Sequence, residues 1–231
     1  MDATSKAELE ASRSITITDP GCEGRRYLRT VLDSFEVAGS DGTHLALVYE
    51  PMRESLSRFQ RRLPEGKMPG YFLKPLLTMV LTGIEYLHEK RHIIHTGNVD
   101  LSTSQPATSD QATIDLKPDN ILLSIESRAA INELVKREME EPSPRKSGGI
   151  RAVYPSRNFG DLEHPPGPPK IADFGLAVSG NVSCPHTHPI QAELFQAPEV
   201  ILEAGWTYST DIWNLGVMVR ITLAGISCIE Y

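Results

Sequence analysis

Apolar residues recur with helical spacing in one long stretch near the middle of the chain. Each apolar position has another one three or four residues away, which is the pattern of a helix that buries one face in a core. We expect this helix to end near His88 to Lys90 and a short strand to follow at His92 to His95. The pattern consists of Leu73, Leu76, Leu77, Val80, Leu81, Ile84 and Leu87.

Two earlier segments have the β-branched, aromatic and apolar composition of strands. Val31 to Val37 and His44 to Tyr49 flank the turn Gly39 to Gly42, so they predict an antiparallel hairpin. Pro51 cannot donate a ladder hydrogen bond, which indicates that the chain leaves the sheet after Glu50.

Shorter helical segments are predicted on both sides of the long helix. Ala7 to Ile15 and the basic segment Ser55 to Arg62 precede it. Ile125 to Glu141, Glu199 to Leu202 and Asp211 to Leu223 follow it, and the last has the apolar density of a buried helix. The mixture of helices and short strands predicts an α+β fold.

Two polar regions interrupt this pattern. Residues 97–114 are dominated by Ser, Thr, Asp, Gln and Asn and have no apolar period, so we expect a polar insert. Residues 124–170 form a second, longer insert, whose part from Pro142 to Pro169 predicts a surface connection rich in proline, glycine and serine. Without the first insert, Thr96 would be followed directly by Asp115.

Composition narrows the class of protein. The chain has 231 residues, of which 40% are hydrophobic, and this is enough for a sizeable core. No apolar run approaches the roughly 20 residues of a membrane span, and Met1 to Arg13 has no apolar signal core. The three cysteines are scattered and are expected to be free thiols, so we predict a soluble protein of the cytoplasm and nucleus.

The candidate chemistry lies in two polar motifs next to apolar strands. Asp115 to Leu123 supplies an aspartate, a lysine and an asparagine, and Ala172 to Gly175 supplies an aspartate on a glycine turn. Phosphoryl transfer from a metal nucleotide requires these types: a carboxylate for the accepting hydroxyl, a cation near the γ-phosphate, and oxygens for Mg²⁺. A polar turn before a buried strand would explain the first motif alone, but not Ala197 to Glu199 or Asp211 to Gly216.

Together these motifs resemble those of eukaryotic-type serine/threonine protein kinases. The chain is more narrowly similar to the fungal kinases of serine/arginine-rich splicing proteins. That resemblance covers nearly the whole chain outside 97–114 and the last few residues. It is based on Gly24 to Phe35, His95-Thr96, Glu141 to Lys146 and His186 to Gln191.

The resemblance implies roles for residues of both motifs. Asp115 would be the catalytic base and Lys117 the cation near the γ-phosphate of ATP. Asn120 and Asp173 would be the Mg²⁺ ligands, and Leu122 would lie under the adenine.

It also implies roles outside these motifs. Glu8, with Glu10 as a second candidate, would pair with an ATP-anchoring lysine, and Glu50 and Met52 would lie at the adenine hinge. Three further residues would support the site from within: His95 and Phe174 in an internal apolar column, and Asp211 as the anchor of the catalytic loop.

The chain departs from the family pattern at several points. No Gly-x-Gly-x-x-Gly and no Val-Ala-x-Lys precede Glu8, and the family would continue into further helices after the helix at Asp211. We therefore expect a protein-kinase-like fold truncated at both ends: residues 1–52 as a remnant of the small β lobe, and 53–231 as an incomplete, mostly helical large lobe. Thr96 replaces the arginine that reads activation-loop phosphate, which argues against that switch.

Three functions are compatible with these residues. The first is a kinase that transfers the ATP γ-phosphoryl group to serine in arginine/serine-rich proteins, and the net charge of −7 suits such a basic substrate. The second is a catalytically impaired fragment or pseudokinase that acts as a binding module. The third, direct nucleic-acid binding, is disfavoured because the arginines of 25–26 and 58–62 fit solvated faces. We expect a monomer without membrane contact.

Overall fold

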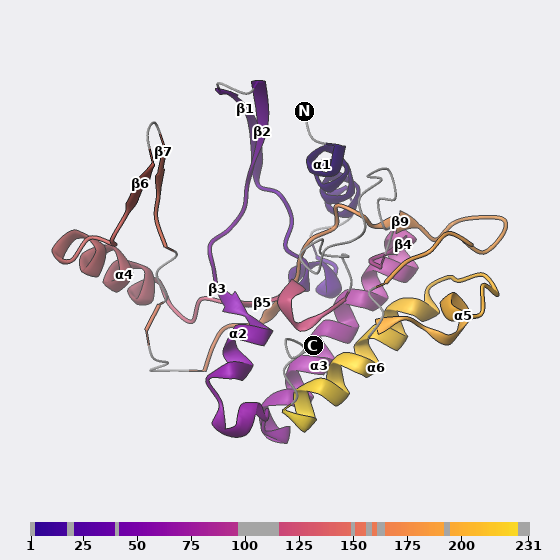
Figure 1. Cartoon of the computed structure of the whole chain (residues 1–231). Coiled ribbons are helices and arrows are strands. Elements are labelled where there is room, and N and C mark those ends of the chain that lie inside the picture. Colours follow the sequence, from indigo (N-terminus) through magenta and orange to yellow (C-terminus); the bar gives the residue numbers. More distant parts are fainter. Residues whose placement is uncertain are drawn as a thin grey trace.

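The structure is a computed structural model that describes residues 3–17, 21–39, 42–96, 116–148, 151–155, 159–160, 165–191 and 195–225. Figure 1 shows a helical body with the β1–β2 hairpin standing away from it. The predicted α+β fold is confirmed. Residues 97–114 and Asp115 lie outside the described residues, so the predicted insert is not tested.

The N-terminal part consists of one helix, one short turn of 3₁₀ helix and the hairpin. Helix α1 (Ala3–Thr16) extends the predicted segment at both ends, and η1 (Glu23–Tyr27) follows. Strands β1 (Asp33–Gly39) and β2 (Gly42–Val48) pair antiparallel, with Asp33 opposite Val48. The predicted hairpin is therefore confirmed, with bounds shifted by about two residues.

A small antiparallel sheet joins the two sequence motifs. Its strands are β3 (Met52–Ser55), β5 (Ile121–Ser124) and β8 (Pro169–Ile171), in the order β3-β5-β8. Strand β5 follows η4 (Pro118–Asn120), and β8 leads directly into Ala172 to Gly175. This pairing brings the two motifs together although a long insert separates them in the sequence.

The helices predicted between residues 53 and 231 are present. Ser55 caps α2 (Leu56–Arg61) by accepting the Arg58 N–H. Helix α3 (Gly70–Glu85) is followed by the π-helical turn η3 (Tyr86–Arg91), which is capped by His92, whose φ is 53°. The remaining short elements are η2 (Pro64–Gly66), β4 (Ile93–Ile94), β9 (Val178–Ser179) and α5 (Pro198–Ile201).

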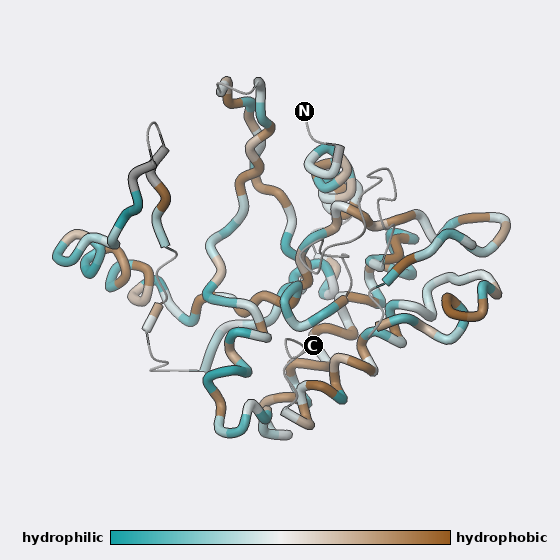
Figure 2. Tube along the Cα trace, viewed as in Figure 1, coloured by the Kyte–Doolittle hydropathy of each residue, from teal (hydrophilic) through white to brown (hydrophobic). Residues whose placement is uncertain are grey.

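The main core forms between α3, the small sheet and α6 (Ser209–Ala224). Figure 2 shows hydrophobic residues along both long helices. Leu73, Leu76, Val80, Ile84 and Leu87 are buried, as the helical spacing predicted. One predicted member of that stripe, Leu81, is 45% exposed, and α6 buries only one face, with Ile212 and Trp213 exposed.

The second insert contains more regular structure than its composition predicted. Helix α4 (Arg128–Glu140) confirms the predicted helix and is capped by Ser127. The segment expected to be a surface connection contains a short hairpin, β6 (Lys146–Gly148) and β7 (Arg151–Val153). The prediction missed it because neither three-residue strand has a clear apolar alternation.

Two expectations from composition concern the described residues. Cys22 and Cys184 are free thiols, as predicted, and Cys228 lies outside the described residues. Each described helix is too short or too polar to cross a lipid bilayer.

Candidate active site

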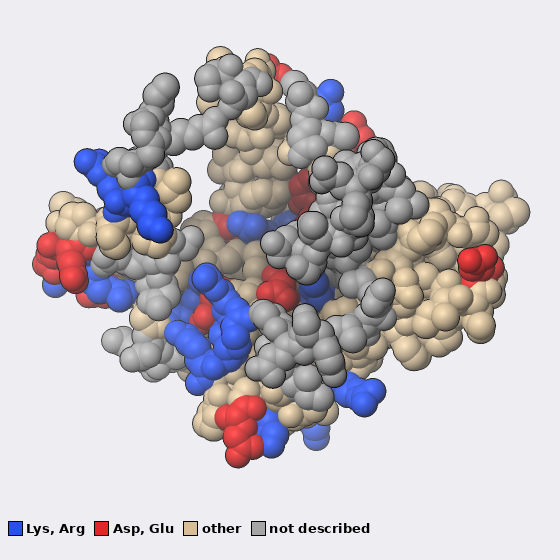
Figure 3. Space-filling view, in the orientation of Figure 1, with Lys and Arg blue, Asp and Glu red and all other residues tan. Residues whose placement is uncertain are grey.

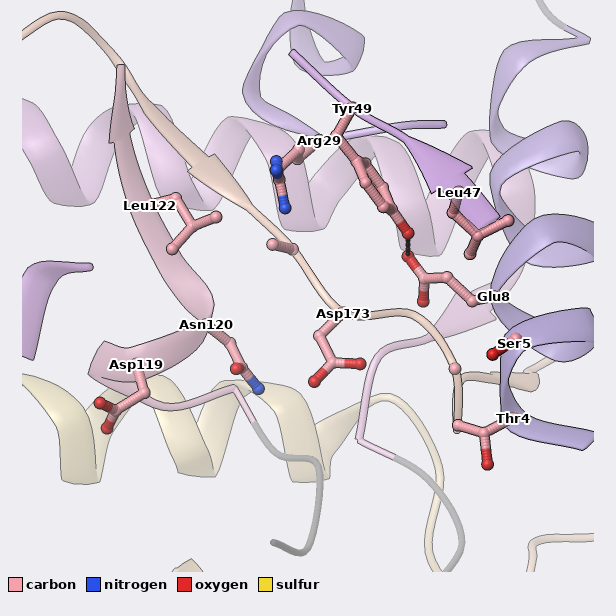
Figure 4. A pocket seen from close by; sticks show the side chains of 12 residues that line it. Thr4, Ser5, Glu8, Arg29, Leu47, Tyr49, Asp119, Asn120, Leu122 and Asp173 are labelled. Atoms are coloured by element: carbon pink, nitrogen blue, oxygen red, sulfur yellow. Dashed lines mark hydrogen bonds between the residues drawn. The ribbon is translucent and has the colours of Figure 1, made fainter. Parts of the chain in front are cut away.

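The two sequence motifs face one pocket of about 360 Å³ beneath the hairpin. Figure 4 shows side chains from α1, the end of β2, β5 and the segment after β8 pointing into it. Four predicted site residues, Glu8, Asn120, Leu122 and Asp173, lie on its wall. The described lining residues are Thr4, Ser5, Glu8, Arg29, Leu47, Tyr49, Asp119, Asn120, Leu122, Ala172, Asp173 and Gly175.

Backbone hydrogen bonds hold Asn120 and Asp173 at the same end of the sheet. The Asn120 N–H donates to the Lys117 carbonyl oxygen at 2.9 Å, which closes the short turn η4. The Asn120 carbonyl oxygen accepts the Ala172 N–H, also at 2.9 Å. The residue that precedes Asp173 is therefore tied directly to Asn120.

Asp173 has a left-handed backbone, with φ at 70°. Such a conformation costs a non-glycine residue about 1–3 kcal/mol, so its surroundings must hold it in place. On one side His95 Nε2 lies 3.0 Å from the Ala172 carbonyl oxygen, and on the other the Phe174 N–H donates to Glu8 Oε2 at 2.5 Å. Contacts on both flanks thus hold the carboxylate of Asp173 toward the pocket.

Glu8 is the buried carboxylate of this site, whereas Glu10, the second candidate, is exposed. Oε1 of Glu8 accepts a hydrogen bond from the Tyr49 hydroxyl at 2.9 Å, and Oε2 of Glu8 accepts one from the Phe174 N–H. Burial raises the pKa of Glu8, an effect that the Tyr49 hydrogen bond opposes and the charge of Asp173 reinforces. Burial also raises the pKa of Tyr49, which keeps its hydroxyl protonated as a donor.

A second layer of contacts supports the site from below. The rings of His95 and Phe174 pack edge to face, with centroids 5.2 Å apart. Both residues are fully buried, so the predicted stacking is present and His95 is also a packed core histidine. Asp211 accepts the backbone N–H groups of His95 and Thr96, as the resemblance implied.

The buried carboxylate of Asp211 has a third partner. His88 Nε2 lies 2.7 Å from Oδ2 of Asp211. Burial alone would raise the pKa of Asp211, but the hydrogen bond with His88, the nearby His95 and the Thr96 N–H together lower it. Asp211 is therefore held as an anion at neutral pH.

Neutral side chains link the catalytic loop to the segment before α5. Nδ2 of Asn214 donates to the Thr96 hydroxyl at 2.9 Å, and Nε2 of Gln191 donates to Asn214 Oδ1 at 3.0 Å. Gln191 Oε1 in turn accepts the Ala197 N–H at 2.7 Å. This chain of buried amides connects Thr96 with the segment before α5.

Four predicted site residues lie outside the lining of the pocket or outside the described residues. Glu50 forms an ion pair with Lys170, and Met52 begins β3 opposite Ser124. Lys117 precedes η4, and Asp115 is not among the described residues. The roles assigned to these four remain predictions.

Two of the lining residues that the sequence did not identify as part of a site have large polar side chains, Tyr49 and Arg29. Tyr49 ends an apolar segment that predicts a strand. Arg29 is a charged residue in the mostly apolar segment from Tyr27 to Leu32, and that interruption is the available signal.

The donor set suits a magnesium nucleotide. Mg²⁺ is usually held by one or two protein oxygens together with substrate phosphates. Asn120 and Asp173 supply an amide and a carboxylate oxygen in one pocket. No group of three or more His, Cys, Asp or Glu in the described ranges could hold a metal by itself.

Comparison with known proteins agrees with this chemistry. The model of the protein kinase domain family matches residues 112–230. A serine/threonine protein kinase of Aspergillus fumigatus is 31% identical over 214 residues, which cover 92% of this chain and 46% of the relative. The serine/threonine-protein kinase SRPK of Physarum polycephalum is 26% identical over 229 residues, which cover 92% of this chain and 49% of the relative.

A plant relative aligns over a shorter part. The serine/threonine-protein kinase AFC3 of Arabidopsis thaliana is 27% identical over 176 residues, which cover 76% of this chain and 35% of the relative. The chain thus spans about half the length, or less, of these curated relatives. Since the family match covers more than half of the chain and includes both motifs, the chain belongs to the protein kinase domain family.

Proposed function

We propose that this chain provides the site of an ATP-dependent serine/threonine kinase, which transfers the γ-phosphoryl group to serine in arginine/serine-rich proteins. The observation that supports this most is the convergence of Glu8, Asn120 and Asp173 on one pocket from three distant parts of the chain. A carboxylate and an amide oxygen that share a pocket with a buried glutamate form the polar set that phosphoryl transfer uses.

Each of these residues would have a separate role in phosphoryl transfer. Asn120 and Asp173 would hold Mg²⁺, which when bound reduces the negative charge of the phosphates. Asp173, whose backbone is left-handed, lies in the lining of the pocket. Asp115 would accept the proton of the substrate hydroxyl, and Lys117, two residues later, would contact the γ-phosphate.

The substrate class is the finer part of this proposal. The net charge of −7 favours a basic peptide, and the similarity to the Physarum kinase supports the splicing-factor type. A peptide of alternating arginine and serine is the direct probe. Two matched peptides, one with alanine for serine and one with alanine for arginine, separate phosphate acceptance from recognition of the basic residues.

The test combines binding and transfer on the purified chain. Millimolar Mg-ATP should raise the melting temperature of the wild type, and Asp173→Ala should abolish the rise. Radiolabelled phosphate should reach the arginine/serine peptide but neither control peptide. Glu10→Gln, on the exposed side of α1, serves as the control variant. A folded wild type without a shift or transfer would refute the kinase proposal.

One observation favours a second function, that of a binding module without catalysis. Among the described residues, Glu8 is bonded to the Tyr49 hydroxyl and the Phe174 N–H rather than to a lysine. A site of this kind could keep its shape without nucleotide. In that case circular dichroism would show a cooperative fold, while Mg-ATP would leave the melting temperature unchanged.

A further inference from the structure

A second recess, of about 650 Å³, lies along α6 and shares no described lining residue with the candidate active site. One face of the helix forms its floor, because residues three, four, seven, eight and eleven positions apart lie on the same side of a helix. The floor residues with this spacing are Ser209, Ile212, Trp213, Gly216, Val217 and Arg220.

The centre of this face is apolar and open to solvent. The side chains of Ile212 and Trp213 are exposed, whereas Leu215 and Met218 on the opposite face of α6 are buried in the core. Helix α5 borders the recess, and Figure 3 shows few charged side chains on the side of the molecule around α5. A contiguous apolar surface of this kind marks an interaction site.

Opposite charges lie at the two ends of the face. Glu199 of α5 lies where α6 begins, because its Oε1 accepts the Ser209 hydroxyl at 2.5 Å. Arg220 lies three helical turns after Ser209, about 16 Å further along the helix axis. Arg220 is exposed and forms no ion pair with a carboxylate in the part of the chain that the structure describes.

The centre of the face is complementary to itself when two copies of α6 lie antiparallel. A twofold axis between Trp213 and Gly216 places Trp213 of each copy opposite Gly216 of the other. The indole then lies over a position without a side chain, where an added Cβ would meet nothing within 4 Å of its own chain. The same axis places Ile212 opposite Val217, so apolar side chains also meet beside the indole.

The charged ends match in the same arrangement. The axis places Arg220 of each copy opposite Ser209 of the other, and Ser209 is bonded to Glu199. One acid and one base would therefore meet at each end of the paired helices. A parallel arrangement would instead bring like charges together, which is unfavourable.

We propose that this chain forms a twofold dimer through α6, with Trp213 of each copy at Gly216 of the other and Arg220 paired with Glu199. The face lies outside the candidate active site, so the dimer is independent of the proposed kinase activity. A dimer differs from the monomer that we expected from the sequence.

Sedimentation equilibrium of the full chain tests this arrangement. The wild type should change from monomer to dimer as its concentration increases. Arg220→Glu and Glu199→Arg should each weaken self-association by about tenfold or more, because each places like charges at both ends. An equimolar mixture of the two variants should associate as the wild type does, since every end contact then joins an acid to a base.

Two further variants control for shape and for general charge. Gly216→Leu fills the space for the indole of the second copy and should weaken the dimer by about tenfold or more, while leucine favours the helix of the monomer. Arg58→Glu reverses an exposed charge on α2 and should leave association unchanged. Circular dichroism and melting temperatures of all variants exclude unfolding as the cause of a loss.

Tryptophan fluorescence gives a local readout of the same contact. The chain has two tryptophans, of which Trp206 is 2% exposed and Trp213 is 42% exposed. Burial of Trp213 in the dimer should shift its emission to shorter wavelength and reduce quenching by acrylamide as the concentration increases. Trp213→Phe should show neither change, because Trp206 is already buried.

Three results would overturn the proposal. A wild type that stays monomeric at every concentration would refute the dimer and leave the face to a different protein. Association that persists unchanged in both Arg220→Glu and Gly216→Leu would show that another surface is responsible. A mixture of Arg220→Glu and Glu199→Arg that fails to associate, with both variants folded, would exclude the antiparallel arrangement.

Discussion

The carboxylate of Asp211 accepts the backbone N–H of Thr96 at 2.8 Å, although 115 residues separate them in the sequence. Both residues are fully buried. The same carboxylate accepts the N–H of His95 and lies against His88, so α6 fixes the backbone that enters the catalytic loop. The residues before the polar insert are thus positioned by a single buried anion.

Asp211→Asn should therefore destabilise the fold strongly. One amide oxygen cannot replace two carboxylate oxygens, and the amide NH₂ would face backbone donors that have lost their acceptor. Removal of a buried, hydrogen-bonded charge costs about 3–5 kcal/mol, and we expect a loss in that range. Urea unfolding followed by circular dichroism at pH 7 measures it.

Acid provides an independent check of the same residue. Because the pKa of Asp211 is lowered in the folded chain, its stabilisation is present above the ordinary value of 3.8 and is lost as pH falls through the lower folded-state value. The stability of Asp211→Asn should therefore not show this decrease as the pH falls. Asp33→Asn, at an exposed strand end, should behave like wild type. A wild-type stability in Asp211→Asn would contradict the anchoring role.

Glu8 should show the opposite dependence on pH. Its pKa is raised, so the folded chain binds the proton more tightly than the unfolded chain. The free energy of unfolding should consequently fall as pH rises from the ordinary value of 4.5 through the higher folded-state value. Glu8→Gln, which has no titratable proton, should flatten this slope in urea unfolding at a series of pH values.

The same variant should lose a structural contact. Glutamine has one carbonyl oxygen, so it cannot accept both the Tyr49 hydroxyl and the Phe174 N–H. We expect about 1–2 kcal/mol of destabilisation at neutral pH from the unpaired group. Glu10→Gln on the exposed face of α1 is the matched control. An unchanged slope in Glu8→Gln would show that another group titrates in this range.

Helices and strands with a strong apolar periodicity could be predicted from the sequence more accurately than the lining of the pocket. The spacing from Leu73 to Leu87 identifies α3, and the turn at Gly39 to Gly42 identifies the hairpin, because both patterns are local. The pocket instead combines Glu8, Arg29 and Tyr49 with residues more than 60 positions later. No local pattern reports such proximity.

Motif spacing and family resemblance therefore supplied part of what periodicity could not. They identified Asn120 and Asp173, whose convergence depends on the pairing of β5 with β8. They did not identify Arg29, because a charge inside an apolar segment reads locally as an exposed position. Helical spacing also predicted that Leu81 is buried. This was wrong because the spacing alone does not show how wide the covered face of α3 is.

Close approach of η1 to α3 gives a test of packing. A Cβ added at Gly24 would lie 2.4 Å from the Thr82 carbonyl oxygen and 2.5 Å from the Tyr86 Cβ. The first atom is backbone of α3 and the second is fixed to the backbone of the following turn η3, so neither can rotate away. Gly24→Ala should therefore cost about 2–3 kcal/mol by overpacking. The shift in melting temperature measures this cost.

Gly70, the first residue of α3, is the matched control. An added Cβ there would meet nothing within 4 Å, and alanine favours helix. Gly70→Ala should be neutral or stabilising by up to about 1 kcal/mol. Similar effects of the two substitutions would mean that η1 does not pack on α3 as described.

Asp173→Gly should separate stability from binding. Glycine adopts a positive φ without strain, so we expect the free energy of unfolding to increase by about 1 kcal/mol. The carboxylate is lost, and Mg-ATP should no longer raise the melting temperature. Measuring the melting temperature with and without Mg-ATP gives both quantities.

Glu203→Gly is the control for backbone strain. Glu203 has a φ of 52° and is exposed, away from the lining of the pocket. It should show a similar gain in stability and an unchanged response to Mg-ATP. A loss of stability in Asp173→Gly would indicate that its carboxylate contributes more to folding than its backbone costs.

The stacked Arg29 and Tyr49 pair also bears on the design of chemical probes for this pocket. A small molecule that extends a carboxylate or tetrazole toward the guanidinium of Arg29, which lines the pocket, would gain a charge-assisted contact. One that extends an amine would instead be drawn to Glu8 and Asp173. The sign of the charge on a single substituent would therefore select which wall of the pocket the compound occupies.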